Sequence, residues 1–177
     1  MIDMKTFFAY LLLGGTLLIA SSLQAQDKSK RASPPAKVSE KIASGATITI
    51  DYSRPSLKGR TVGQTVEPMK GQVWRMGANE ATVFATDKNV TIDGQALPAG
   101  KYALFGLWGD DGYTLIFNKA YSIWGTEYEK NKDQDALKVV VRPRRTDKTQ
   151  EQLLYTINKK GDVSLLWGTM AVDFQVR

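Results

Sequence analysis

Hydrophobic and polar residues alternate along most of the chain, and a period of two predicts β-strands rather than helices. In the segment 46–53, Ile48, Ile50 and Tyr52 fall on one face, while threonines and Asp51 fall on the other. Such a strand has one face in the core and one face in solvent. Further strands are predicted over 37–42, 82–86, 89–92, 102–108, 113–118, 137–142, 152–158, 163–167 and 170–176.

Short polar turns separate the predicted strands. Ser44 and Gly45 suit a hairpin turn between the first two strands, and Pro98 and Gly100 occupy positions typical of a type I turn. Residues 125–135 contain four carboxylates and two lysines and predict a charged loop or a short helix. Nine or ten strands with such turns predict an all-β protein, either an antiparallel, jelly-roll-like β-sandwich or a flattened barrel.

The first 25 residues predict a secretory signal peptide rather than part of the fold. A charged start precedes an uncharged stretch over 7–20, and the small Ala25 ends the segment. The uncharged stretch is shorter than the roughly 20 residues that cross a bilayer. We therefore expect cleavage, no stable membrane anchor and a periplasmic or extracellular location. Residues 26–35 predict a basic, flexible tether, and residues 36–177 a single β-sandwich domain.

The composition removes several classes of chemistry, because the chain contains no cysteine and no histidine. Disulfides, Ser-His-Asp and Cys-His nucleophile systems, and metal sites that need imidazole or thiolate are impossible. We expect no metal and no cofactor, which leaves carboxylate chemistry and ligand binding. Much of the net charge of +6 lies in the segment 26–37, where four basic residues face one aspartate. Without a nucleic-acid-binding motif it does not predict nucleic acid as a partner. Attraction to acidic glycans or anionic lipid surfaces explains the basic charge better than nucleic acid does. A soluble spacer without a partner explains it better still.

The segment 73–82, VWRMGANEAT, concentrates polar and aromatic side chains around one glycine. Its structural explanation is a turn in which Gly77 adopts a positive φ and the side chain of Asn79 caps the turn. Glu80 then pairs with Arg75 or another arginine. We give this explanation more weight, because ion-pair networks also gather charge without a function.

The functional alternative combines VWRMGANEAT with the segment 51–60, DYSRPSLKGR. On facing strands, the two segments would form a pocket with a carboxylate floor and a guanidinium rim. Non-catalytic binding of a polar or anionic ligand there, such as a glycan, is the leading hypothesis. The predicted ligand-binding residues are Tyr52, Arg54, Arg60, Trp74, Arg75, Asn79 and Glu80.

Two other functions remain open. A hydrolase would use two carboxylates, such as Asp51 and Glu80, as acid and base. Because almost any acidic pair satisfies so loose a pattern, an enzyme is the less favoured hypothesis. The third is a structural or assembly module of the cell envelope, with an exposed strand edge as the contact.

The tryptophans bear on ligand binding, because an exposed aromatic face can stack on a sugar ring. Trp167 alternates with Leu165 and Val163, which predicts a core position. Trp124 follows the end of a strand and precedes a glycine, so we expect it to be exposed. The basic run 142–145, RPRR, could bind a polyanion. It more simply predicts a strand exit whose charges discourage edge pairing.

The order of motifs resembles a bacterial family known as domain of unknown function 2911, whose members are exported proteins mostly of Bacteroidetes. The strings SPPA, DYSRPSLKGR, VWRMGANEAT, LPAGKYALF, LIFNK and WGT carry the resemblance, which spans residues 33–177. It implies an exported β-sandwich-like domain and no assigned activity. Family members often carry an aromatic residue after K-G-R-[ST] and a V-P-Y before the W-R string. Val62 and the segment 67–69, EPM, stand there instead, which implies an altered site if those aromatics line one.

Overall fold

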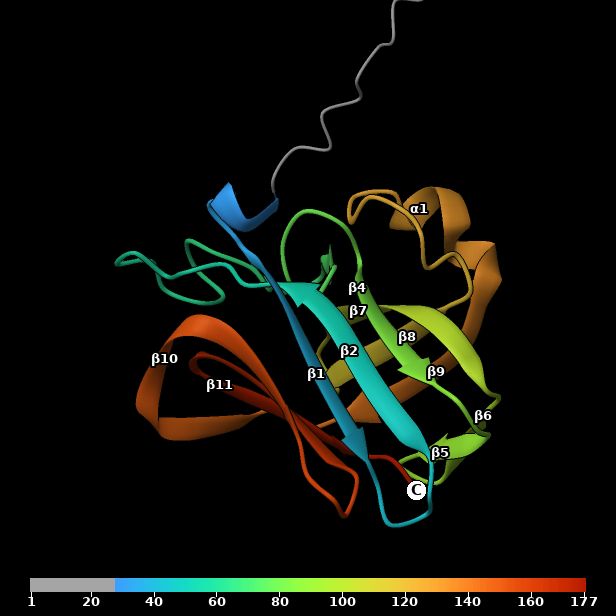
Figure 1. Cartoon of the computed structure of the whole chain (residues 1–177). Helices are drawn as coiled ribbons and strands as arrows, with labels where there is room; N and C mark the ends of the chain where they lie inside the picture. Colours follow the sequence, from blue (N-terminus) through green and yellow to red (C-terminus); the bar gives the residue numbers. More distant parts are fainter. Residues whose placement is uncertain (1–27) are drawn as a thin grey trace, which may run out of the picture.

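The computed structural model describes residues 28–177, and strands dominate them (Figure 1). The predicted signal peptide and residues 26 and 27 of the predicted tether lie outside the described residues. The helical elements are α1 (Tyr128–Asn131) and two 3-10 helices, Lys28–Lys30 and Lys132–Gln134. The strands are β1 (Pro35–Lys41), β2 (Thr47–Ser53), β3 (Val73–Trp74), β4 (Thr82–Thr86), β5 (Val90–Ile92), β6 (Gln95–Leu97), β7 (Gly100–Trp108), β8 (Tyr113–Asn118), β9 (Asp135–Val141), β10 (Arg144–Ile157) and β11 (Asp162–Gln175).

The main sheet is antiparallel and has seven strands. Six follow the order β1-β2-β4-β7-β8-β9, and β3 pairs with β7. The alternation predicted for 46–53 is confirmed, since Ile48, Ile50 and Tyr52 are buried while Thr49 and Asp51 are half-exposed. One face of the sheet therefore forms the core, and the other carries the polar positions.

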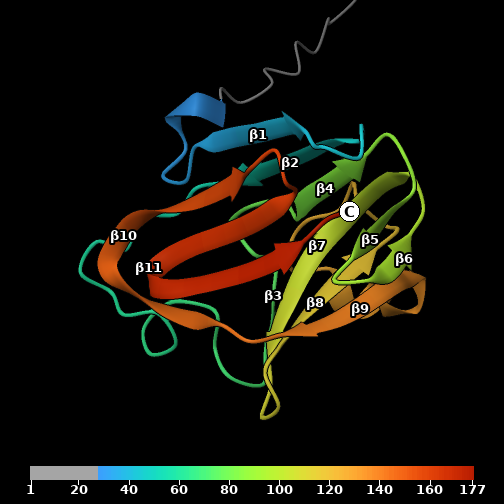
Figure 2. The same cartoon turned by 90° about the horizontal axis from the view of Figure 1, so that it is seen from below.

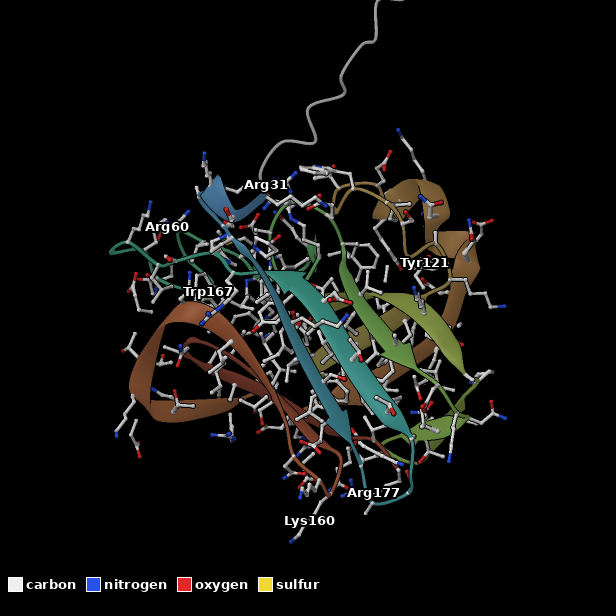
Figure 3. All side chains as sticks on the ribbon, in the orientation of Figure 1. Arg31, Arg60, Tyr121, Lys160, Trp167 and Arg177 are labelled. Carbon is white, nitrogen blue, oxygen red and sulfur yellow. The ribbon has the colours of Figure 1, made fainter. Side chains whose placement is uncertain are left out.

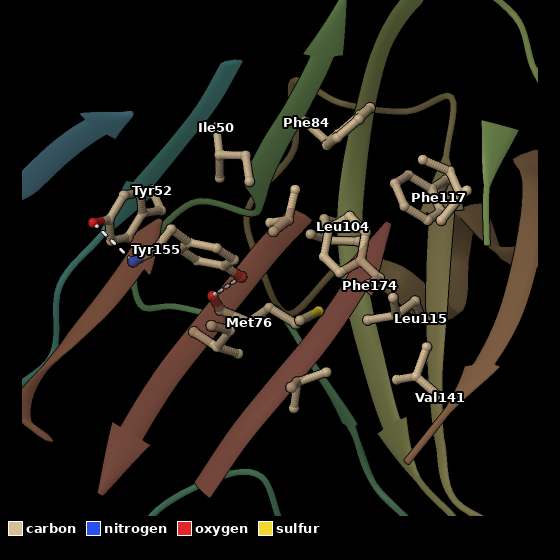
Figure 4. Close-up of a cluster of buried hydrophobic side chains, with 14 of the residues drawn as sticks. Ile50, Tyr52, Met76, Phe84, Leu104, Leu115, Phe117, Val141, Tyr155 and Phe174 are labelled. Carbon is tan, nitrogen blue, oxygen red and sulfur yellow. Dashed lines mark hydrogen bonds between the residues drawn. The ribbon is translucent and has the colours of Figure 1, made fainter. Parts of the chain in front are cut away.

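The hairpin of β10 and β11 lies against the core face of this sheet (Figure 2). Figure 4 shows Phe84, Leu104 and Phe117 from the sheet facing Tyr155 and Phe174 from the hairpin. The rings of Phe84 and Phe117 meet edge to face, with centroids 5.2 Å apart. These two layers confirm the all-β sandwich. The described strands do not close into a barrel.

Hydrogen bonds inside this core tie the layers together. The hydroxyl of Tyr52 accepts the backbone N–H of Tyr155 at 3.2 Å, and the hydroxyl of Tyr155 donates to the carbonyl of Met76 at 2.9 Å (Figure 4). Trp167 is fully buried, as predicted, and its indole N–H donates to the carbonyl of Glu67 at 2.7 Å. The polar groups of Tyr52, Tyr155 and Trp167 all have hydrogen-bond partners. They therefore fix how the two layers pack at little cost in desolvation.

The hairpin departs from the prediction in two ways. The run RPRR is a strand exit only in its first half, because Arg142 and Pro143 follow the end of β9 whereas Arg144 already begins β10. The strands predicted over 163–167 and 170–176 are one strand, β11, which continues through Gly168 at a φ of +60°. A glycine interrupts the hydrophobic alternation there without ending the strand, and this explains the error.

A smaller apolar cluster covers part of the outer face, over β7 and β8. Phe105 and Ile116 pack beneath Tyr128 of α1, and the ring centroids of Phe105 and Tyr128 are 5.0 Å apart. Asp135 accepts hydrogen bonds from the Tyr128 hydroxyl and the Asn118 amide, both at 2.8 Å. The charged loop or short helix predicted over 125–135 is confirmed as α1 and a 3-10 helix. It leaves the outer face of β2 and β4 uncovered.

The described part of the predicted tether contacts the domain. The backbone N–H of Arg54 donates to the carbonyl of Pro34 at 2.9 Å, and β1 begins at the next residue, Pro35. Arg31 reaches Glu80 by side-chain hydrogen bonds. Among residues 28–177, none of the helices has the length and hydropathy required to span a membrane.

Candidate functional site

A groove of about 450 Å³ lies on the outer face of the main sheet. Its floor comes from β2 and β4, and the segment 121–124 forms one wall. A hollow of about 180 Å³ adjoins it on the side of β1, and the two share Asp51, Glu80, Ala81 and Val83. The groove therefore occupies the part of the outer face that α1 leaves open.

Strand register sets the floor. Asp51 of β2 lies opposite Val83 of β4, and Ala85 of β4 lies opposite Lys101 of β7. All four point to the outer face, because their neighbours along each strand point into the core. Val83 and Ala85 are short, so the floor is low and apolar between the carboxylate of Asp51 and the ammonium of Lys101.

A short antiparallel pairing holds the wall. The backbone N–H of Ala81 donates to the carbonyl of Ile123, and the N–H of Gly125 donates to the carbonyl of Asn79, both at 3.2 Å. Glu80 and Trp124 face each other in this bridge. The end of VWRMGANEAT is thus the strand-like support that places Trp124 beside Glu80.

The wall requires a glycine at position 125, because the backbone there packs directly against the side chain of Arg75 and leaves no room for a Cβ. A Cβ at position 125 would lie 1.9 Å from the Cδ of Arg75. The Nε of Arg75 is buried and has no hydrogen-bond partner among the described residues. The methylenes of Arg75 therefore support the wall by packing, rather than by presenting a guanidinium to the groove.

Two aromatic side chains stand exposed on the wall. Tyr121 is 42% exposed and Trp124 is 46% exposed. Apart from these two, Val140 on β9 is the only exposed large hydrophobic residue in the range 28–177. The ammonium of Lys101 lies 5.6 Å from the centre of the Tyr121 ring, a cation–π contact. The exposure expected for Trp124 is confirmed.

The carboxylate of Glu80 is paired with two cations. Arg31 donates through Nη1 to both carboxylate oxygens at 2.9 Å, and the ammonium of Lys28 lies 3.1 Å from Oε1. Partial burial by itself would raise the pKa of Glu80. Hydrogen bonds from its own backbone N–H, from Arg31 and from Lys28 outweigh that effect and lower the pKa to about 2. Glu80 is therefore an ionised acceptor at neutral pH.

The turn predicted for VWRMGANEAT is corrected at two residues, Gly77 and Asn79. Gly77 does not have a positive φ, whereas Met76 and Asn79 do, at 51° and 62°. A glycine is needed at 77 for space, because a Cβ there would lie 2.8 Å from the Thr82 hydroxyl. Asn79 does not cap the turn, since its amide donates to the carbonyl of Ser33 at 3.1 Å. The alternative that Glu80 pairs with an arginine other than Arg75 holds, and that arginine comes from the predicted tether.

The guanidinium rim predicted between the two segments does not form, although Asp51, Tyr52 and Glu80 line one hollow. Tyr52 and Trp74 are core residues, and the indole N–H of Trp74 donates to the carbonyl of Gly77 at 3.1 Å. The Nε of Arg54 donates to the carbonyl of Leu153 at 3.0 Å. Arg54 is thus bound to a backbone carbonyl, and Tyr52 and Trp74 face the core. None of the three lines the rim that the sequence had predicted.

Glu80 is the one predicted ligand-binding residue that lines the groove, and Tyr52 borders only the adjoining hollow. Arg60 lies far from Tyr121 (Figure 3) and lines a different cleft. Asp51, nominated with Glu80 as a carboxylate pair, does line the groove. Sequence reasoning missed Lys101 and Tyr121. The only signal for the wall was the glycine after Trp124.

Comparison with known proteins places these features in a family. A family model described as protein of unknown function (DUF2911) matches residues 33–176. No curated protein and no solved structure matches the chain. The matched range contains the whole groove floor and wall, together with the β10–β11 hairpin.

Proposed function

The chain belongs to the DUF2911 family, and we propose that it is an exported, non-catalytic module that binds a glycan in the groove of β2, β4 and β7. The observation that carries this proposal is the exposure of Tyr121 and Trp124 beside two carboxylates, Asp51 and Glu80, in one groove. Its volume of about 450 Å³ falls in the range of small-ligand sites.

Sugar rings offer both kinds of surface that this groove complements. Their C–H faces stack on aromatic rings, which supply large contact area at low entropic cost. Their hydroxyl edges donate hydrogen bonds, and a carboxylate accepts several at once. Trp124 and Tyr121 supply the first element, while Asp51 and Glu80 supply the second.

A neutral or hydroxyl-rich glycan suits the charges better than an acidic one. The lining contains two carboxylates and one lysine, Lys101. Nearby Lys28 and Arg31 are occupied by Glu80, and Lys37 lies 3.4 Å from Asp51. The two carboxylates would repel an incoming anion, and no arginine lines the groove to compensate for that repulsion.

A carboxylate-based hydrolase is the second candidate, because Asp51 and Glu80 line the same groove. The low pKa of Glu80 suits a nucleophile or a base, not a general acid at neutral pH. The acid role would fall to Asp51, which is half-exposed on β2. Binding without turnover needs no such division of roles and is the better supported proposal.

The test is isothermal titration calorimetry against neutral oligosaccharides of differing linkage, with Trp124→Ala as the key variant. We expect at least one oligosaccharide to bind, and the variant to weaken binding by about tenfold, because it removes the stacking surface. Val140→Ala removes an even more exposed hydrophobic side chain, which does not line the groove, and should leave the affinity unchanged. If the two variants bind alike, or if no oligosaccharide binds, the proposal fails. Product formation that Asp51→Asn or Glu80→Gln abolishes would favour the hydrolase.

A further inference from the structure

A second cleft, of about 410 Å³, lies away from the groove. It opens between the loop after β2, the end of β7, the start of β10 and the bend of β11. Arg60 belongs to this cleft and is separated from Tyr121 in Figure 3. The two cavities share no lining residue, so the second can have a ligand of its own.

The charge of this cleft is of one sign. Arg60, Arg144 and Arg145 line it, and no acidic residue does. The groove described above has two carboxylates and one lysine in its lining. Guanidinium groups are the side chains best suited to phosphate and carboxylate, because their planar donors match the oxygens of these anions in pairs.

The three guanidinium groups differ in how far they are occupied. Arg60 is fixed, because its Nε donates to the carbonyl of Leu57 at 2.9 Å and its Nη2 to the carbonyl of Ser56 at 2.7 Å. Arg144 pairs with Asp173 on β11. The backbone of Arg145 pairs with Met170, but its guanidinium group makes no hydrogen bond or ion pair to any residue in the range 28–177, so its donors are open to a ligand.

The rest of the lining is largely apolar. Leu57, Val62, Trp108 and Met170 form it, with Gly168 where the hairpin approaches most closely. A Cβ on Gly168 would lie 2.8 Å from a methyl carbon of Val62. Leu57 and Met170 are buried, and Trp108 is half-buried. An inorganic anion would leave these surfaces unused.

From this combination we propose that the cleft binds an amphiphilic anion, with a phosphate or carboxylate head group held by Arg145 and Arg60 and an alkyl body against Trp108 and Met170. The site is independent of the glycan groove, and its failure would leave that proposal intact. An extended polyanion fits poorly, because the apolar walls would face its charged backbone.

The experiment titrates the protein with decyl phosphate below its micelle concentration, with decanol and inorganic phosphate as comparison ligands. Binding is followed by calorimetry and by the indole N–H resonance of Trp108 in ¹⁵N spectra. We expect decyl phosphate to bind and to shift that resonance. Decanol and inorganic phosphate should each bind at least about tenfold more weakly, because each lacks one half of the interaction.

Charge reversal at the cleft gives the matched test. Arg145→Glu should weaken decyl phosphate binding by tenfold or more, on the scale of about one lost charge-assisted hydrogen bond. Arg142→Glu makes the same charge change on the other side of Pro143, outside the cleft, and should change the affinity less than about twofold. If Arg145→Glu lowers the melting temperature, Arg145→Ala replaces it in the same binding measurement and should also weaken the affinity for decyl phosphate. Equal affinity for decanol and decyl phosphate, equal effects at positions 142 and 145, or an unmoved Trp108 resonance would each overturn the proposal.

Discussion

Tyr113 and Tyr155 are both fully buried, but only Tyr155 has a partner for its hydroxyl. The hydroxyl of Tyr113 has none among the described residues, and its ring lies over Gly106, where a Cβ would clash with that oxygen. Burial raises the pKa of both phenols. A buried hydroxyl without a partner costs free energy, whereas a satisfied one contributes a little.

Removing each hydroxyl should therefore have opposite effects. We expect Tyr113→Phe to raise the free energy of unfolding by about 1 kcal/mol, because an unsatisfied polar atom is removed. Tyr155→Phe should lower it by about 1 kcal/mol, because the hydrogen bond to Met76 is lost. Urea unfolding of the two variants measures both values. Changes of the same sign would show that the two hydroxyls do not differ in this way.

The ion pairs of Glu80 predict a specific dependence of stability on pH. The pKa of Glu80 is lowered to about 2 in the folded protein and lies near 4.3 in an unfolded chain. The ionised form therefore stabilises the fold above about pH 4.3, and this contribution is lost as pH falls toward about 2. Glu80→Gln removes the titrating group. We expect the stability gap between the two proteins, measured by urea unfolding, to narrow over that interval. A gap that stays constant would contradict the role of Arg31 and Lys28.

At the scale of elements, the sequence predicts the strands that bury alternate residues and misses those held by backbone pairing alone. The segments 102–108 and 113–118 appear as β7 and β8. The first half of β10 carries polar residues on both faces and is mostly exposed, so pairing with β11 holds it rather than buried side chains. The groove wall escaped prediction for the same reason, because no periodic pattern encodes the contact of 79–81 with 123–125. Residue type alone suggested Asp51 and Glu80 as a carboxylate pair and Trp124 as an exposed aromatic residue. It did not predict that all three line one groove.

The turn between β10 and β11 packs against the backbone of Val176, which follows the end of β11. Gly161 and Gly59 have nearly the same φ, +80° and +78°, but a Cβ at 161 would lie 2.1 Å from the carbonyl oxygen of Val176, whereas nothing lies within 4 Å at 59. Gly59→Ala should cost about 1 kcal/mol for the left-handed backbone alone. Gly161→Ala should cost at least about 2 kcal/mol more, since backbone must move. Similar melting temperatures for the two variants would show that the turn adapts freely.

At the scale of the whole molecule, the two cavities differ in the sign of the charge that lines them. The groove contains both carboxylates of the proposed glycan site, while the arginine cleft contains three guanidinium groups and no acid. Residues 28–30 lie at the upper end of the sandwich in Figure 1, and the C-terminus lies at the lower end. Because Lys28 and Arg31 bind Glu80, the chain enters the domain beside the groove.

The backbone pairing beneath Trp124 has a consequence for kinetics and entropy. The segment 123–125 forms backbone hydrogen bonds with 79–81 and packs against Arg75, so its conformation is fixed before any ligand binds. A wall that is already ordered loses little conformational entropy on binding and requires no closing step. Association at this groove should therefore be a simple bimolecular encounter, and differences in affinity between glycans should arise in how slowly each one leaves.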